Sequence, residues 1–302
     1  MNPPRDPIYL AGPTGCGKTA VALALARLAP PVEIVNADAF QAYRGFEILS
    51  AAPTPEERTL CPHHLFGVLD PAEENAAAAF ATKAKAAIAE ISRRALPLVV
   101  GGSGLYLKAI THGLAPVPKG DAALRAELDS LGLDDLVARY RVLDPAGAAE
   151  TNLKNRRYVT RNLEICLLSD RAASELKAEW AENSPAIRAV HLHRDRADLD
   201  ERIVRRTAAM LAAGAVTEVA RLGPLSATAE KAIGLREIRS LLVGGTDEAD
   251  CQEAIRLATR RYAKRQETWF KREADFLKLP VPHDEPPMET ADRIARHFGL
   301  SR

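Results

Sequence analysis

The chain has 302 residues, of which 47% are apolar and 27% are charged, and 41 Lys and Arg balance 40 Asp and Glu. This composition is typical of a globular protein and excludes a disordered or collagen-like chain, while the length suits two domains or one large domain with an insertion. No apolar run is long enough to span a bilayer and residues 1–7 hold no apolar signal core, so we expect a cytoplasmic protein without a membrane partner.

Short apolar strands alternate with helical patterns over the first hundred residues. This alternation predicts an α/β fold with a parallel sheet. The predicted strands are 8–11, 32–35 and 96–100, and the predicted helices are 18–28, 76–94 and 105–112.

The pattern changes after residue 113, where a linker at 116–121 leads into helical patterns without a clear strand. Residues 187–193 alternate again and are predicted to return to the first sheet. From residue 198 onward the pattern is helical, and the proline-rich tail 280–287 is predicted to wrap the surface. We therefore expect a core made of residues 1–115 and 186–302, the second part with a helical C-terminal region, interrupted by a helical insertion at residues 116–185.

A complete phosphate-binding loop follows the first strand. The motif G-x4-GK[ST] is formed by Gly12, Pro13, Thr14, Gly15, Cys16, Gly17, Lys18 and Thr19. Backbone N–H groups of such a loop converge on phosphate oxygens, Lys18 would neutralise a terminal phosphate, and Thr19 would offer its hydroxyl to Mg²⁺. The motif favours a site for a ligand with a di- or triphosphate, such as ATP, rather than a glycine-rich turn that binds no ligand. It does not specify whether the phosphate is hydrolysed, transferred or expelled.

The cysteines point to no metal or disulfide framework. Cys16, Cys61, Cys166 and Cys251 are widely spaced, which favours reduced thiols, and Cys16 is expected to fill a small-residue position rather than to react. The run 61–64 (CPHH) lacks a complementary pair of ligands and is interpreted as a structural turn.

Asp38 is the main candidate for a catalytic carboxylate. It follows the strand at 32–35, and the carboxyl ends of parallel strands meet at one edge of a sheet, so it should face the phosphate-binding loop. Two roles are open for it, a ligand of Mg²⁺ and a general base. Asp70 is a second candidate that we expect to be structural, and no apolar run ends in the Asp-Glu pair of an ATPase.

Basic residues cluster in two places, although the net charge of +1 argues against a nucleic-acid partner when taken alone. Along the helix predicted at 253–272, Lys264 and Arg265 belong to two neighbouring basic rows, and Arg157 and Arg161 belong to a cluster in the insertion. The alternative is that these basic residues only form a solvent-exposed helix face. Such rows can contact nucleic-acid phosphates without reading sequence. Trp269 and Phe270 are expected to pack the helix rather than stack on bases.

Four further blocks follow the phosphate-binding loop in order: 33–45 (EIVNADAFQAYRG), 62–65 (PHHL), 99–106 (VVGGSGLY) and 260–270 (RRYAKRQETWF). Together they closely resemble tRNA dimethylallyltransferases, and the resemblance runs from about residue 8 to residue 272. It implies a P-loop NTPase-like core in which the loop holds the diphosphate of dimethylallyl diphosphate. It also implies a monomer that uses Mg²⁺ and prenylates N6 of the adenosine immediately 3′ of the anticodon of tRNA.

The resemblance also assigns roles to individual residues. Asp38 becomes the general base, and Phe40 and Gln41 belong to the turn that meets the target adenine. The residues expected near the leaving diphosphate are Ser103, Arg202 and Arg205 in addition to the loop itself. The residues expected to contact tRNA are Asp38, Ala39, Phe40, Gln41, Ser103, Arg125, Arg157, Arg161, Lys231, Gly234, Arg236, Lys264 and Arg265.

This sequence departs from the family pattern at a few positions. Ala39 stands for a serine beside the base, Ala52 for a lysine, Leu235 for a tyrosine and Asn162 for an alanine. None of these changes removes the phosphate-binding loop or Asp38. Two alternatives remain at this point: a P-loop kinase or prenyltransferase acting on a free small molecule or adenine nucleotide, and an RNA-binding protein that uses the loop as a nucleotide switch. Phe40 and Tyr43 are either aromatic partners of a base or core residues.

Overall fold

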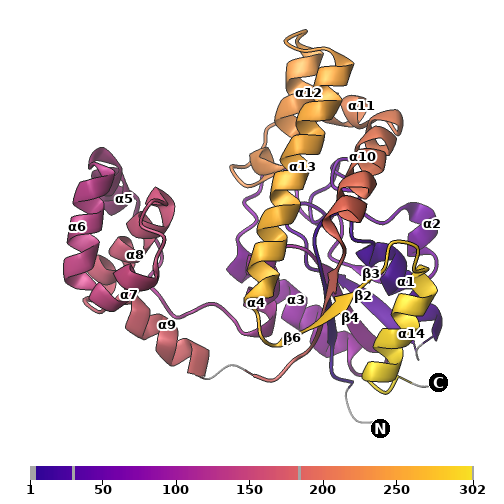
Figure 1. Ribbon diagram of the computed structural model, residues 1–302, viewed down its shortest axis with the longest axis horizontal. Coiled ribbons are helices and arrows are strands. Elements are labelled where there is room, and N and C mark those ends of the chain that lie inside the picture. The colour runs from indigo at the N-terminus through magenta and orange to yellow at the C-terminus, as the bar shows by residue number, and fades with distance from the viewer. Residues whose placement is uncertain (1–4, 29–30, 183–184, 301–302) are drawn as a thin grey trace. The chain divides into compact units, whose positions relative to one another are not determined.

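The computed structural model describes residues 5–28, 31–182 and 185–300 of the chain, which divides into two compact units (Figure 1). The first unit contains residues 1–111 and 186–302, and the second contains residues 112–185. The insertion expected at 116–185 falls within the second unit. In the described part of the chain, no helix has the length and apolar character needed to cross a membrane.

A six-stranded parallel sheet forms the centre of the first unit, which confirms the predicted α/β class. The order across the sheet is β3-β2-β4-β1-β5-β6, with β1 in register beside both β4 and β5. The strands are β1 Ile8–Ala11, β2 Val32–Asn36, β3 His63–His64, β4 Leu96–Gly101, β5 Arg188–His193 and β6 Phe276–Pro280. β1, β2 and β4 are buried along their whole lengths; β1 and β4 accordingly lack the alternation of a half-exposed strand, while β2 also buries Glu33 and Asn36.

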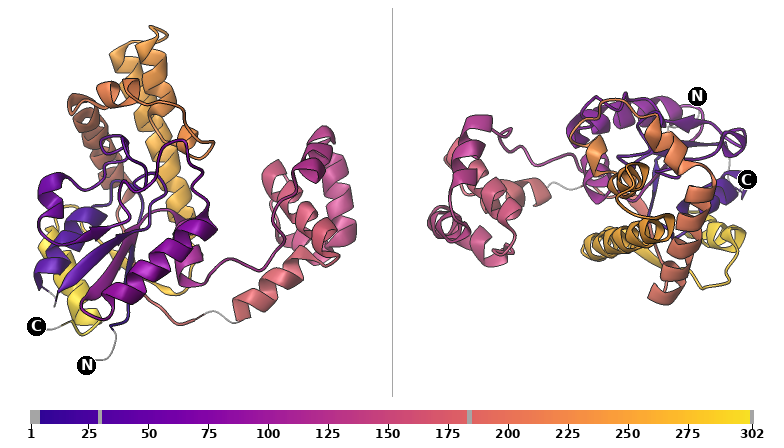
Figure 2. Two further views of the ribbon diagram at one scale, coloured as in Figure 1. Left: turned by 180° about the vertical axis from the view of Figure 1, so that it is seen from behind. Right: turned by 90° about the horizontal axis from the view of Figure 1, so that it is seen from above.

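Helices cover both faces of this sheet (Figure 2). Successive strand residues alternate between two apolar cores: Tyr9 and Val99 contribute to the core shared with α3, α4 and α13, while Leu10 and Leu98 contribute to the core shared with α1 and α14. The helices of this unit are α1 Lys18–Leu28, α2 Pro55–Arg58, α3 Ala77–Ile91, α4 Gly104–Thr111, α10 Arg196–Ala212, α11 Ala215–Ala220, the 3-10 turn Ala229–Lys231, α12 Leu235–Leu242, α13 Glu248–Lys271 and α14 Pro287–His297.

The second unit contains only helices in its described residues and has its own apolar core around Leu128, Tyr140 and Leu163. The helices are α5 Ala122–Ser130, α6 Leu133–Leu143, α7 Pro145–Glu150, α8 Arg156–Ser169 and α9 Ala173–Glu182. Asn162, one of the departures from the family pattern, is buried in this core. Its amide donates to the Tyr140 hydroxyl (2.8 Å) and accepts from Lys177 Nζ (2.6 Å).

Strand β6 corrects the expectation that the chain is helical from residue 198 onward. Its backbone pairs with β5 from Phe276 beside Ala189 to Pro280 beside His193. The proline-rich tail beyond it is followed by α14, which packs against α1. Strand β6 therefore adds an edge to the sheet, and the helix after the tail covers it.

Candidate active site

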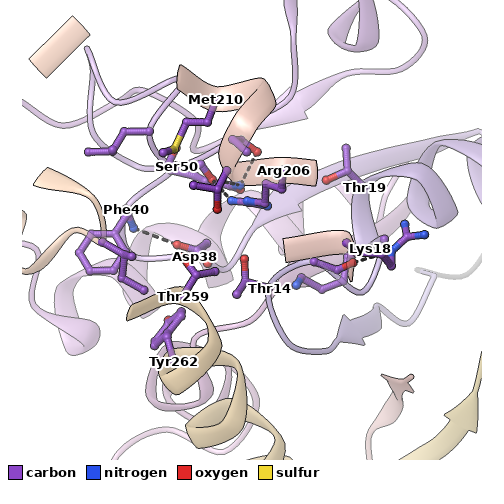
Figure 3. Close-up of a pocket in the computed structure, with 18 of the residues that line it drawn as sticks. Thr14, Lys18, Thr19, Asp38, Phe40, Ser50, Arg206, Met210, Thr259 and Tyr262 are labelled. Atoms are coloured by element: carbon purple, nitrogen blue, oxygen red, sulfur yellow. Dashed lines mark hydrogen bonds between the residues drawn. The ribbon is translucent and has the colours of Figure 1, made fainter. Parts of the chain in front are cut away.

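A cavity of about 560 Å³ opens at the carboxyl ends of β1, β2 and β4, where an open α/β sheet is expected to bind its ligand (Figure 3). Its wall comes from segments that are distant in sequence: the phosphate-binding loop with the start of α1, the turn 38–41, the loop 49–51, Glu57 of α2, the end of β4, helices α10 and α13, and residues 232–233. The cavity thus joins both candidate sites predicted from the sequence, the phosphate-binding loop and Asp38.

The phosphate-binding loop has the backbone conformation that its glycines allow. Gly15 and Gly17 have φ angles of +84° and +96°, in the left-handed region that favours glycine. Thr14, Gly15, Gly17, Lys18 and Thr19 line the cavity, whereas the side chains of Pro13 and Cys16 are buried. Cys16 therefore occupies a small-residue position, as expected, and all four cysteines are free thiols.

Several positively charged side chains line the cavity. Lys18 Nζ donates to the carbonyl oxygens of Gly12 (2.8 Å) and Pro13 (2.9 Å), and Arg202 Nε donates to the carbonyl oxygen of Gly15 (2.8 Å). Arg206, which sequence analysis did not assign, is one helical turn from Arg202 and also lines the cavity. Burial lowers the pKa of Arg206, and the nearby charge of Asp38 opposes this effect. A desolvated guanidinium on a cavity wall favours an anionic ligand.

Asp38 is held in place by the backbone around it. Its Oδ1 accepts a hydrogen bond from the Phe40 N–H (3.0 Å), and its own N–H donates to Oδ1 of the buried Asn36 (2.7 Å). The Asn36 amide also donates to the Asp38 carbonyl oxygen (3.0 Å), which closes a tight turn after β2. The carboxylate thus reaches the cavity from a backbone that the sheet holds rigidly.

Another part of the cavity wall is apolar. Leu49, Met210, Ile233 and Ile255 come from four different segments, and Phe40 lies beside Asp38 (Figure 3). Since neither a diphosphate nor an adenine edge needs an aliphatic wall, this region suits a small hydrocarbon group next to the phosphate-binding end. The sequence analysis missed this wall because its members share no local pattern.

Helix α13 adds polar groups that were quoted in a family block but not assigned. The Gln266 side chain accepts from the Thr14 N–H (2.8 Å) and donates to the Gly102 carbonyl oxygen (2.8 Å), so one amide joins α13 to two loops of the site. Tyr262 lines the cavity; burial raises its pKa to about 12, and the charge of Asp38 adds to the effect. Both residues could have been found from the sequence, because they are polar residues on the face of a basic helix that turns away from solvent.

Comparison with known proteins agrees with this geometry. A family model described as IPP transferase matches residues 41–273. A tRNA dimethylallyltransferase of Akkermansia muciniphila is 46% identical over 293 residues, covering 97% of this chain and 99% of the relative. The chain belongs to the IPP transferase family. The resemblance seen in the sequence motifs is thereby confirmed.

Further members of the family and related structures extend this comparison. A tRNA dimethylallyltransferase of Thermus thermophilus is 41% identical over 302 residues, covering 96% of this chain and 98% of the relative. The crystal structure of the full-length tRNA isopentenylpyrophosphate transferase from Bacillus halodurans is similar with a TM-score of 0.71 at 31% identity, covering 98% of this chain and 96% of that one. A eukaryotic dimethylallyltransferase acting on tRNA has a TM-score of 0.79 at 26% identity, covering 97% of this chain and 79% of that one.

Of the other site residues that the family resemblance suggested, some line the cavity and some do not. Gln41 and Arg205 line the cavity together with Asp38 and Phe40. Ser103 is buried and stays outside the described cavity wall; its Oγ accepts from the Ala39 N–H (3.3 Å). Lys231, Gly234 and Arg236 flank the wall residues Ala232 and Ile233, with Lys231 and Arg236 exposed.

The basic face of α13 is partly neutralised. Arg256 pairs with Glu253 (2.6 Å) and Arg260 pairs with Asp200 (3.1 Å), so acids are nearer to this face than the helix pattern suggested. Lys264 and Arg265 are exposed further along the helix. Trp269 packs against Gly104, where a Cβ would overlap the indole ring, and Phe270 is fully buried, as expected for packing residues.

Two of the three basic residues proposed in the insertion have structural partners. Arg125 and Arg161 both bind the buried carboxylate of Glu164, at 2.7 and 2.6 Å, and together they lower its pKa against the effect of burial. Arg157 is exposed on α8. A guanidinium that compensates a buried carboxylate is needed for stability, so Arg125 and Arg161 serve the core of this unit in addition to any contact with RNA.

Three remaining hypotheses have clear outcomes. Tyr43 is a core residue, only 1% exposed, and its hydroxyl lies 3.1 Å from the Glu73 carbonyl oxygen. Asp70 pairs with Arg44 on the surface and accepts from the Ala72 N–H, so it is structural as expected. The expected turn at 61–64 is wrong in part, because His63 and His64 form strand β3 beside β2; the 2.7 Å contact of His64 with Glu33 agrees with a structural role for this run.

Proposed function

We propose that the chain transfers a dimethylallyl group from dimethylallyl diphosphate to N6 of the adenosine 3′-adjacent to the anticodon in tRNA and releases diphosphate. The observation that carries this proposal is a single cavity in which a phosphate-binding loop, an aliphatic wall and a fixed carboxylate face one another. The names of the relatives support the same reaction. A kinase would need the loop and could use the carboxylate, but phosphoryl transfer has no use for the aliphatic wall.

The chemistry requires a proton acceptor. The lone pair of the exocyclic amine of adenine is conjugated into the ring, so N6 is a weak nucleophile. As the N6–C1 bond forms and the C1–O bond to diphosphate breaks, N6 loses a proton, which the Asp38 carboxylate accepts. General-base catalysis of this kind contributes about 10²–10⁴-fold in rate. The Phe40 N–H keeps one carboxylate oxygen oriented while the other is available to N6.

The leaving diphosphate gains negative charge as the C1–O bond breaks. Backbone N–H groups of the loop, Lys18, Arg202, Arg205 and Arg206 surround the place where this charge develops. Fixed donors stabilise a charge that grows in the transition state, and removal of one strong donor costs about 10²–10³-fold in rate. In this enzyme the phosphate-binding loop acts as a trap for a leaving group and not as a site for ATP hydrolysis.

We propose that Mg²⁺ assists the diphosphate. The described residues include no group of three or more His, Cys, Asp or Glu side chains that could hold a metal alone. Mg²⁺ in phosphate sites is held by one or two protein groups together with phosphate oxygens and water, and the Thr19 hydroxyl on the cavity wall fits this role. The ion would neutralise charge on the leaving group.

The target adenosine has to leave its stack to reach Asp38. Extrusion of a base costs a few kcal/mol, which stacking and edge contacts in the pocket offset. Phe40 is available on the cavity wall for such stacking, whereas Tyr43 is not because it is buried. Exposed cations near the cavity mouth, Lys231 and Arg236, and those on α13, Lys264 and Arg265, are proposed to contact phosphates of the tRNA.

One assay tests the proposal directly. We propose that the protein acts as a monomer in the cytoplasm. The purified protein is incubated with Mg²⁺, labelled dimethylallyl diphosphate and one of three acceptors: unmodified tRNA, AMP or ATP. We expect label in tRNA, at the adenosine 3′ of the anticodon. Label in AMP or ATP without label in tRNA would overturn the proposed substrate in favour of a free nucleotide.

A further inference from the structure

Two arginines hold the phosphate-binding loop from the side of its carbonyl groups. Arg202 Nε donates to the Gly15 carbonyl oxygen (2.8 Å), and Arg194 Nε donates to the Cys16 carbonyl oxygen (2.9 Å). Arg202 lines the cavity, whereas Arg194 is only 5% exposed and stays outside the described wall. Nothing so far gives Arg194 a role.

The bond from Arg194 fixes the direction of a neighbouring N–H group. The C=O of Cys16 and the N–H of Gly17 belong to one planar trans peptide, so they point in opposite directions. With the carbonyl held by Arg194, the Gly17 N–H is held toward the opposite side, where the loop receives an anion. Gly17 has a φ of +96°, in the left-handed region that glycine enters without strain, so its own conformational preference constrains this peptide plane little and the Arg194 bond can fix it.

Arg194 carries a neutralised charge. Its Nη1 donates to Asp198 Oδ2 (2.7 Å) and to the Pro282 carbonyl oxygen (3.0 Å), and Asp198 is itself 4% exposed. His283 Nδ1 lies 3.0 Å from the other oxygen of Asp198. Because a carboxylate offsets the guanidinium, the effect of Arg194 on an anion comes from orientation more than from attraction at a distance.

We propose that Arg194, supported by Asp198 and the tail 282–283, is a positioning residue that orients the Gly17 N–H toward the diphosphate of the donor. This inference rests on the proposed function for the identity of the donor, whereas inorganic pyrophosphate is a probe that offers the loop the same phosphate oxygens. The tail beyond β6 thereby contributes to the site through Arg194.

The test measures binding of inorganic pyrophosphate with Mg²⁺ by calorimetry, which requires no prenyl transfer. The double variant Arg194→Met/Asp198→Leu removes both charges of the buried pair, which avoids an isolated buried charge and leaves the net charge unchanged. We expect pyrophosphate affinity to fall about tenfold, the effect of one lost hydrogen bond to a charged group, and tRNA affinity to stay within twofold. An unchanged pyrophosphate affinity overturns the proposal.

A matched control separates orientation of the loop from loosening of the tail. Arg293 on α14 binds Glu285 (2.8 Å) and the Pro280 carbonyl oxygen (3.0 Å), so Arg293→Met loosens the same tail without touching the loop. We expect this variant to keep wild-type pyrophosphate affinity, and an equal loss in both proteins overturns the proposal. Arg194→Lys keeps the charge, but one ammonium replaces a forked guanidinium that donates to Cys16, Asp198 and Pro282, so kcat and pyrophosphate affinity should both fall. If wild-type protein does not prenylate tRNA, the proposed function fails while the pyrophosphate measurement still decides on Arg194.

Discussion

Replacement of Asp38 by asparagine is the sharpest test of the proposed chemistry. The asparagine side chain has the same shape and keeps an oxygen that can accept the Phe40 N–H bond of 3.0 Å, so the turn 38–41 should hold. It cannot accept the proton of N6. We therefore expect kcat to fall by about 10²–10⁴, which corresponds to about 2.7–5.5 kcal/mol in the barrier, with little change in tRNA affinity.

The measurement is single-turnover transfer of labelled dimethylallyl to tRNA, which isolates the chemical step from product release. Glu57→Gln is the matched control, because Glu57 is another carboxylate on the cavity wall and its neutral form keeps the acceptor for the Thr54 N–H (2.8 Å). This control should remain within threefold of wild type. A rate near that of wild type in Asp38→Asn would refute the assignment of the base.

Three further predictions follow from charges and burial. Lys264→Ala with Arg265→Ala should reduce the slope of log K against log salt for tRNA binding by about 1.5, while Lys83→Ala with Lys85→Ala on the exposed face of α3 should not change it. Thr19→Ala should raise the Mg²⁺ concentration for half-maximal activity several-fold, and a titration that matches wild type would argue against Thr19 as a ligand. Burial raises the pKa of Glu218 to about 7, although its carboxylate accepts from the Ile48 and Leu49 N–H groups. A raised carboxyl pKa stabilises the fold at low pH and loses this contribution as pH rises from about 4.5 through 7. The unfolding free energy of wild type should therefore drop between pH 5 and pH 8 by about 2 kcal/mol more than that of Glu218→Gln, as measured by urea titration at each pH. Equal drops in the two proteins would contradict this prediction.

The phosphate-binding loop and Asp38 could be predicted because short stretches of sequence identify them. The phosphate-binding loop is a contiguous motif, and Asp38 follows from the rule that strand ends meet at one edge of a sheet. Helix α1 and strand β1 were predicted to the residue. In each case the residues that decide the conformation lie within a few positions of one another.

The rest depended on contacts between distant segments. Strand β6 has five residues with a lysine in the middle, and it exists as a strand because β5 pairs with it from more than 80 residues away. The pairing of Arg125 with Glu164 joins residues 39 positions apart in sequence. Arg206 could have been found, because it is four residues after Arg202 and therefore on the same face of α10.

The strand order has a consequence for how the protein is made. Strand β1 can pair with β4 once residue 101 has been synthesised, but its other neighbour, β5, ends at residue 193. At about 5–20 residues per second, the ribosome needs roughly 5–20 s for the 92 residues between 101 and 193. For that time the nascent half-sheet has an unpaired apolar edge along β1, the kind of edge that invites pairing with another chain. The helical unit, with its own core, is synthesised in this interval, so its length sets how long the nascent chain is exposed to aggregation.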